Sequence, residues 1–153
     1  MLLLIYVTKY MEYIMQGFDV LKKYKYDLIE NCPNDKINDI QHEKYYRISK
    51  NKELTDEDFL PQYWSQPDRR EKFELNGKCC EYQGLSCFAT YDEAVNMSNR
   101  FALGDYFHNA TKLEEYATIK DIGNNTYPTH VNIYILDNVN EKEDLDWSLE
   151  NEN

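Results

Sequence analysis

The sequence predicts a single α+β domain in which an N-terminal helix packs on a small mixed or antiparallel sheet. The chain has 153 residues, 42% of them hydrophobic, which suits one domain with a buried core. Segments with the hydrophobic spacing of helices and segments with that of strands follow one another along the chain, but the two kinds do not alternate strictly. No repeat or low-complexity linker divides the chain, so we expect one domain over residues 1–136 and an acidic C-terminal tail over 137–153.

Residues 2–30 have the hydrophobic spacing of a helix. Large apolar side chains recur there at intervals of three and four: Leu3, Tyr6, Val7, Tyr10, Ile14, Phe18 and Leu21. The sequence NCPND at 31–35 ends the helix, because Pro33 cannot continue it. We therefore expect an N-terminal helical segment over 1–31 that packs on the main domain, with a partner-binding element as the alternative.

Four strands are expected, near residues 45–49, 85–89, 116–120 and 130–136. The first, YYRIS, is rich in tyrosine and isoleucine, which favour strands. The last, HVNIYIL, alternates polar and apolar residues as the two faces of a strand require. In the second strand, Leu85 and Cys87 would share one face of the sheet, and Ser86 would share the other face with Phe88.

Two helix starts are marked by an N-capping residue. Each is a threonine followed three residues later by an acid, the spacing of a capping box: Thr55 with Asp58, and Thr90 with Glu93. The second pair opens a helix expected over 91–101. A structural role therefore accounts for Thr90 and Glu93, whereas Ser86 has no such role. The stretch 60–82, broken by proline and glycine, is expected to be a packed loop.

The chain is acidic, with 28 Asp and Glu against 17 Lys and Arg and a net charge of −11. Residues 137–153 hold seven acids and one lysine, so we expect an exposed tail in which Trp147 is the only large side chain that docks. An acidic surface repels phosphate backbones, which disfavours non-specific nucleic-acid binding. It favours a partner protein with a basic surface.

The spacing of cysteine and histidine residues does not indicate a metal site. The four cysteines form no CxxC pair, and none of the three histidines stands at ligand spacing from another, so we expect no metal. The apolar opening MLLLIYV is too short to cross a bilayer, and no leader cleavage site follows it. We expect a cytoplasmic protein with reduced cysteines and no membrane contact.

Four short motifs between residues 45 and 136 resemble a set of small uncharacterised bacterial proteins. They are YYRIS, then TDEDF, then GLSCFATYDEA, and finally the strand that contains THVNIYI. Together they match the pattern YR, DF, GLSxF and H of that set. The resemblance implies no function, because none is known for the set.

A more distant resemblance is to the ADP-ribosyltransferase fold. Enzymes of one branch of that family have an arginine on an early strand, a serine on a middle strand and a Glu-x-Glu near a late strand. Here Arg47 in YYRIS, Ser86 in GLSCF, and Glu141 and Glu143 in NEKED follow in that order. The family's Ser-Thr-Ser is replaced by Leu-Ser-Cys in this chain.

This resemblance implies NAD as the substrate and a role for each residue. Arg47 would hold the NAD pyrophosphate through charge-assisted hydrogen bonds, and Ser86 would fix the neighbouring ribose or the glutamate. Glu143 would stabilise the positive charge that develops on the ribose as nicotinamide leaves. Tyr91 or Tyr45 would stack on the nicotinamide. The implied function is a small NAD-using transferase, such as a toxin or a phage-defence or counter-defence factor.

Two other classes of function are open. A non-enzymatic acidic interaction protein, such as an inhibitor, immunity or anti-defence protein, would cover a basic site on a partner. A nucleophilic enzyme could use a cysteine with His130, although Cys87 lies in an apolar strand where a thiol is usually an inert small hydrophobe. The transferase hypothesis, with Glu143 as the expected acid, gains support if Arg47, Ser86 and a glutamate surround one cleft, and it fails if they lie far apart.

Overall fold

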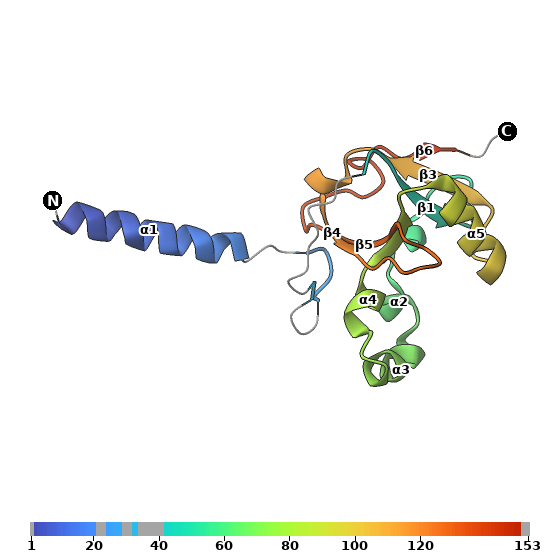
Figure 1. The fold of residues 1–153 in the computed structure, drawn as a ribbon, viewed down its shortest axis with the longest axis horizontal. Coiled ribbons are helices and arrows are strands. Elements are labelled where there is room, and N and C mark those ends of the chain that lie inside the picture. Colours follow the sequence, from blue (N-terminus) through green and yellow to red (C-terminus); the bar gives the residue numbers. More distant parts are fainter. Residues whose placement is uncertain (1, 21–23, 29–31, 34–41, 151–153) are drawn as a thin grey trace.

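A six-stranded antiparallel sheet forms the centre of the protein, with the strand order β4-β5-β2-β1-β3-β6 (Figure 1). The structure is a computed structural model that describes residues 2–20, 24–28, 32–33 and 42–150. Its helices do not alternate strictly with its strands. The predicted α+β class is therefore confirmed, with the sheet antiparallel.

The described elements agree with the predicted strands to within one or two residues. In chain order they are α1 (Leu2–Val20), β1 (Tyr45–Ser49), η1 (Asp56–Phe59), α2 (Gln62–Ser65), η2 (Pro67–Arg69), α3 (Arg70–Leu75), α4 (Cys79–Gln83), β2 (Leu85–Phe88), α5 (Tyr91–Phe101), β3 (Tyr106–Ala110), η3 (Leu113–Glu115), β4 (Ala117–Asp121), β5 (His130–Ile135) and β6 (Ser148–Leu149). Short helices occupy the stretch 60–82, where the sequence predicted a loop.

Strands β3 and β6 are absent from the prediction. Four of the five residues of β3 are buried, so both faces of the strand are covered. Its sequence YFHNA therefore lacks the alternation of polar and apolar residues by which a half-exposed strand is recognised. Its buried polar side chains find partners in other segments: His108 Nε2 lies 3.3 Å from the carbonyl oxygen of Asn51, and Asn109 Nδ2 donates to that of Ser148 at 3.3 Å. These partners are distant in sequence, so β3 was not recognisable from its own residues.

Hydrophobic side chains form two clusters, and alternate residues of β1 and β2 contribute to different ones. The larger cluster includes Tyr45, Leu85 and Cys87, together with side chains of β4 and β5. The second includes Tyr46 and Phe88, with Ala94 and other side chains of α5. The predicted division of β2, with Leu85 and Cys87 on one face and Phe88 on the other, is confirmed.

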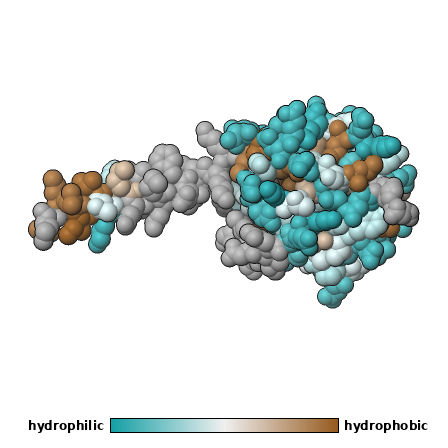
Figure 2. Space-filling model, turned by 90° about the horizontal axis from the view of Figure 1, so that it is seen from above, coloured by the Kyte–Doolittle hydropathy of each residue, from teal (hydrophilic) through white to brown (hydrophobic). Residues whose placement is uncertain are grey.

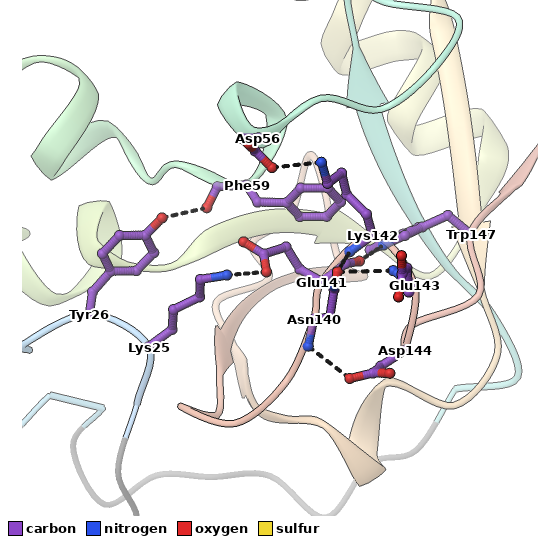
Figure 3. Close-up of polar contacts among 10 residues, drawn as sticks. All are labelled: Lys25, Tyr26, Asp56, Phe59, Asn140, Glu141, Lys142, Glu143, Asp144 and Trp147. Atoms are coloured by element: carbon purple, nitrogen blue, oxygen red, sulfur yellow. Dashed lines mark hydrogen bonds and ion pairs between the residues drawn. The ribbon is translucent and has the colours of Figure 1, made fainter.

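The acidic C-terminal segment packs into the fold, contrary to the expected exposed tail. Val139 and Leu145 join the larger hydrophobic cluster, and Glu141 is buried beside Lys25, with which it forms an ion pair (Figure 3). Trp147 docks on Phe59, as expected, with ring centroids 6.0 Å apart. Strand β6 then pairs with β3. The segment is therefore part of the domain up to residue 150.

Helix α1 is present, but its described side chains do not pack on the sheet. Large apolar residues of its first half are exposed: Leu2, Leu3, Leu4, Ile5, Tyr6, Val7, Tyr10 and Met11. Figure 1 shows the helix lying clear of the sheet, and Figure 2 shows apolar surface at its end. Among the described residues, no helix is long and apolar enough to cross a membrane. The expected packing of this helix is wrong for residues 2–11.

The second part of the predicted helix has a different structure. Residues 21–23 and 29–31 lie outside the described residues. Between them, Tyr24 forms a β-bridge with Leu136, and the Lys25 N–H donates to the Ile135 carbonyl at 2.9 Å. Residues 24–28 therefore extend along the end of β5 and do not continue the helix.

A disulfide joins Cys32 to Cys80, 48 residues apart in sequence. The expectation of reduced cysteines is therefore corrected for this pair. Cys79 and Cys87 are thiols outside this disulfide, and Cys87 is buried. The disulfide joins segments that lie far apart in the sequence, a pairing that cysteine spacing alone does not predict.

Helix α5 begins at the predicted N-cap, Thr90. The acid of the capping box, Glu93, also contacts Thr129, which the sequence did not indicate. Thr90 Oγ1 accepts a hydrogen bond from the Glu93 N–H at 3.3 Å. The Glu93 carboxylate accepts hydrogen bonds from the Thr90 hydroxyl and from the N–H and hydroxyl of Thr129. Burial alone would raise the pKa of Glu93, but these hydrogen bonds hold it below its ordinary value. Glu93 thus ties α5 to the residue before β5.

We expect Thr90→Ala to lower the free energy of unfolding by about 1 kcal/mol, because the substitution leaves a helix N–H without its cap. Urea denaturation of the two proteins measures the difference. Thr90→Ser keeps the hydroxyl and serves as the control, with a smaller loss. Loss of ligand binding in a fully folded Thr90→Ala protein would contradict the purely structural role.

Candidate functional site

An open cleft of about 900 Å³ lies where β1, β2 and β5 meet α4 and the end of α5. Its volume is within the range of about 300–1,000 Å³ found for ligand pockets. The lining residues that matter for its chemistry are Arg47, Ser86 and His130 from the strands, and Arg69, Lys78 and Arg100 from the helices and their ends. We call this site the cleft.

Arg47 is fixed in the cleft by backbone carbonyl groups. Its Nη1 donates to the Ser86 oxygen at 2.9 Å, and its Nε and Nη2 donate to the Asp58 oxygen at 3.2 and 2.9 Å. Burial lowers the pKa of the guanidinium, while Cys87 and Asp58 act in the opposite direction. A guanidinium has five N–H donors, so two remain beyond these three hydrogen bonds. Arg47 is therefore a cation held rigidly at the wall of the cleft.

Ser86 and His130 form a hydrogen-bonded pair within the cleft. Ser86 is opposite Asn132, and Phe88 is opposite His130, so the serine and the histidine are diagonal neighbours across β2 and β5. The distance from Ser86 Oγ to His130 Nε2 is 3.1 Å. The His130 ring also stacks on Phe88, with centroids 4.7 Å apart.

The electrostatic environment of His130 decides what this pair can do. Burial lowers the pKa of His130 to about 4, although Glu93 and Asp121 act in the opposite direction. The imidazole is therefore neutral near pH 7. A group of such low basicity is a weak general base, because proton abstraction at neutral pH favours a pKa near 7. We infer that His130 orients the Ser86 hydroxyl rather than activating it as a nucleophile.

The cleft is cationic although the protein is acidic. Arg47, Arg69, Lys78 and Arg100 line it, and Glu81 is the one carboxylate among the described lining residues. In the part of the chain that the structure describes, none of these four cations forms an ion pair with a carboxylate. Unpaired cations around a concave site raise the local concentration of anions. The cleft is suited to an anionic ligand.

The structure brings together two of the three predicted catalytic residues. Arg47 and Ser86 both line the cleft, and the Arg47 guanidinium donates to the backbone carbonyl of Ser86. Glu143 is not among the described lining residues: it is exposed on the C-terminal segment, in a turn where its N–H donates to Asn140 (Figure 3). The order of these residues in the sequence therefore predicted the meeting of Arg47 and Ser86 but did not place Glu143 at the cleft.

The two predicted stacking residues, Tyr45 and Tyr91, also lie outside the described lining of the cleft. Tyr45 is fully buried in the larger hydrophobic cluster, and its hydroxyl accepts from the His42 N–H at 3.1 Å. Tyr91 is half-buried and packs edge-on against Phe107, with centroids 5.3 Å apart. Tyr82 and Tyr127 are the tyrosines among the described lining residues.

The pairing of a cysteine with His130 as a nucleophilic site is not supported for Cys87. Its side chain is fully buried in the larger hydrophobic cluster. Burial raises the pKa of the thiol to about 12, although Arg47 acts in the opposite direction. Cys87 is therefore an uncharged core side chain at neutral pH, as expected for a thiol in an apolar strand.

The sequence indicated some of the remaining cleft residues and not others. His130 and Asn132 stand two apart on an alternating strand, so their shared face was visible in the pattern. Arg69, Lys78 and Arg100 come from different elements, and no local motif connects them. Among the described residues, no group of three or more His, Cys, Asp or Glu is placed to hold a metal ion.

These features define a class of protein: an α+β domain whose antiparallel sheet bears a cationic cleft with an Arg–Ser–His constellation. Comparison of the chain with protein-family models, curated proteins and solved structures finds no match. The resemblances described above therefore remain predictions.

Proposed function

We propose that the protein binds NAD in the cleft and acts as a small ADP-ribosyltransferase-like protein. The observation that supports the proposal is that Arg47 and Ser86, two residues that carry the resemblance in the sequence, line one cationic cleft. NAD is anionic through its pyrophosphate, which suits the excess of basic lining residues.

Each residue has a role in this proposal that its contacts support. The two remaining donors of Arg47 would bind the pyrophosphate as charge-assisted hydrogen bonds. Ser86, oriented by His130, would hold a ribose hydroxyl. Tyr82 or Tyr127 would stack on a ring of the ligand, in place of Tyr45 and Tyr91.

Transfer of ADP-ribose needs a carboxylate near the ribose to stabilise its developing positive charge. Glu143 was predicted for this role, and Glu81 is the carboxylate that the structure places in the lining. Replacing each in turn by glutamine separates the two assignments, because an amide cannot neutralise the charge. The relevant residue is the one whose substitution slows nicotinamide release while NAD binding persists.

Calorimetric titration with NAD tests the binding step. We expect Arg47→Ala to weaken NAD binding by about tenfold or more, because a hydrogen bond to a charged group contributes roughly 1.5–3 kcal/mol. Lys52→Ala removes an exposed cation that is not in the described lining and is the matched control. If Arg47→Ala does not fold, Arg47→Lys, which retains the charge, is titrated in its place. Absence of heat from the wild type at millimolar NAD would contradict the proposal.

A second candidate, a non-enzymatic acidic interaction protein, is favoured by the exposed acids of the C-terminal segment. Glu143, Asp144 and Asp146 are all exposed there. They would face a basic site on a partner protein, as in an inhibitor, immunity or anti-defence protein. Reversal of their charge would then weaken the complex in a salt-dependent way and would leave NAD binding unchanged.

A further inference from the structure

One wall of the cleft is built by α4 and the residue before it. Lys78, Glu81 and Tyr82 all line the cleft. Helix α4 has five residues, which is too short to be stable through its own hydrogen bonds. Its position must therefore come from contacts with the rest of the fold.

Non-covalent contacts hold α4 against β5 and α3. Asn132 Nδ2 donates to the Glu81 oxygen at 2.8 Å, and the Tyr134 hydroxyl donates to the Cys80 oxygen at 2.9 Å. Tyr82 stacks on Phe73 of α3, with ring centroids 3.8 Å apart. The helix α3 is itself only six residues long.

The disulfide adds a covalent tie at the middle of this wall. Cys80 lies in the sequence between Lys78 and Glu81, both of which line the cleft. Its disulfide partner, Cys32, belongs to another part of the chain. The segment before Cys32 is attached to the end of β5 through Tyr24 and Lys25. Both cysteines are half-buried, so a small thiol can reach the bond.

We propose that the Cys32–Cys80 disulfide is a redox control of the cleft, with the oxidised protein the form that binds ligand. A dithiol reductant gives two electrons and two protons to the disulfide, which becomes two thiols, while the reductant becomes a disulfide. Helix α4 then keeps its position only through its non-covalent contacts. This inference rests on the proposed function, because the affected property is ligand binding in the cleft.

The expected effect follows from the fraction of molecules in which α4 is in place. If reduction lowers this fraction to about a tenth, the apparent affinity falls about tenfold. NAD titration of the oxidised full chain, and of the same protein kept in dithiothreitol, measures this change. Cys32→Ser should bind weakly with or without reductant, whereas Cys79→Ser, which keeps the disulfide, should behave as the wild type.

Hydrogen exchange of residues 79–84 provides a readout that does not depend on NAD. We expect faster exchange in this segment after reduction and in Cys32→Ser, with the amides of β5 unchanged. Equal exchange in the oxidised and reduced proteins would overturn the redox proposal, whether or not NAD binds. Measurable NAD binding of equal affinity in the two forms would also overturn it. Faster exchange without NAD binding to the oxidised protein would instead contradict the proposed function and leave the redox control of α4 in place.

Discussion

Acidification from about pH 6.5 to pH 4 is expected to lower the free energy of unfolding by up to roughly 3 kcal/mol through His130. Burial beside Phe88 disfavours the imidazolium in the folded protein, so the pKa of His130 falls to about 4. In the unfolded chain the histidine has its ordinary pKa of 6.5. Between these two values the unfolded chain binds the additional proton, so this contribution is complete above pH 6.5 and is lost progressively as the pH falls to about 4.

Urea denaturation at closely spaced pH values measures this loss, and His130→Gln is the control because glutamine does not titrate. The variant should be less stable than the wild type near pH 7 but should lose less stability between pH 6.5 and 4. Carboxylates with lowered pKa values, such as Glu93 and Asp58, begin to lose their contribution below about pH 5 in both proteins, so the difference between the two pH profiles isolates the contribution of His130. Parallel pH profiles for the two proteins would contradict the assignment to His130.

Leu145→Ala is expected to lower the free energy of unfolding by about 3 kcal/mol. The Leu145 side chain is 2% exposed and belongs to the larger hydrophobic cluster, so its truncation leaves a cavity in addition to the lost apolar burial. Leu149→Ala is a matched control in the same segment, because Leu149 is 40% exposed and should cost under about 1 kcal/mol. Urea denaturation of both variants gives the comparison.

Similar small losses in the two leucine variants would show that residues 137–150 do not contribute to the core. A large loss confined to Leu145→Ala would confirm that this acidic segment belongs to the domain. The comparison is informative because both substitutions remove the same atoms from the same stretch of chain. The two side chains differ strongly in burial.

The parts of the fold that the sequence predicted have a local pattern. Strand β5 alternates polar and apolar residues, and α5 begins at a threonine with an acid three residues later. The parts it missed depend on distant partners. Glu141 is buried because Lys25, 116 residues away, neutralises it. The acids that follow it in the sequence, Glu143, Asp144 and Asp146, favour an exposed tail.

Contacts between distant segments also limited what the sequence could predict about the candidate site. Arg47 and Ser86 were selected because they follow the order of a known pattern, and the sheet brings them together. Glu143 fits that order equally well, but the local run of acids makes such a match easy to obtain. Whether a residue reaches the cleft depends on the path of the chain after β5, and neither residue type nor spacing indicates that path.

The strand order has a consequence for the kinetics of folding. Among the described strands, β4 and β5 are the only sheet neighbours joined by a short connection, whereas β1 pairs with β3, β2 with β5, and β3 with β6. Each of these other pairs closes a long loop before its hydrogen bonds can compensate for the lost chain entropy. The β4–β5 hairpin can form early, but β2 and β1 have no place in the sheet until segments far apart in the sequence have met. The domain therefore belongs among proteins that fold slowly for their size, and its partly folded states expose unpaired strand edges.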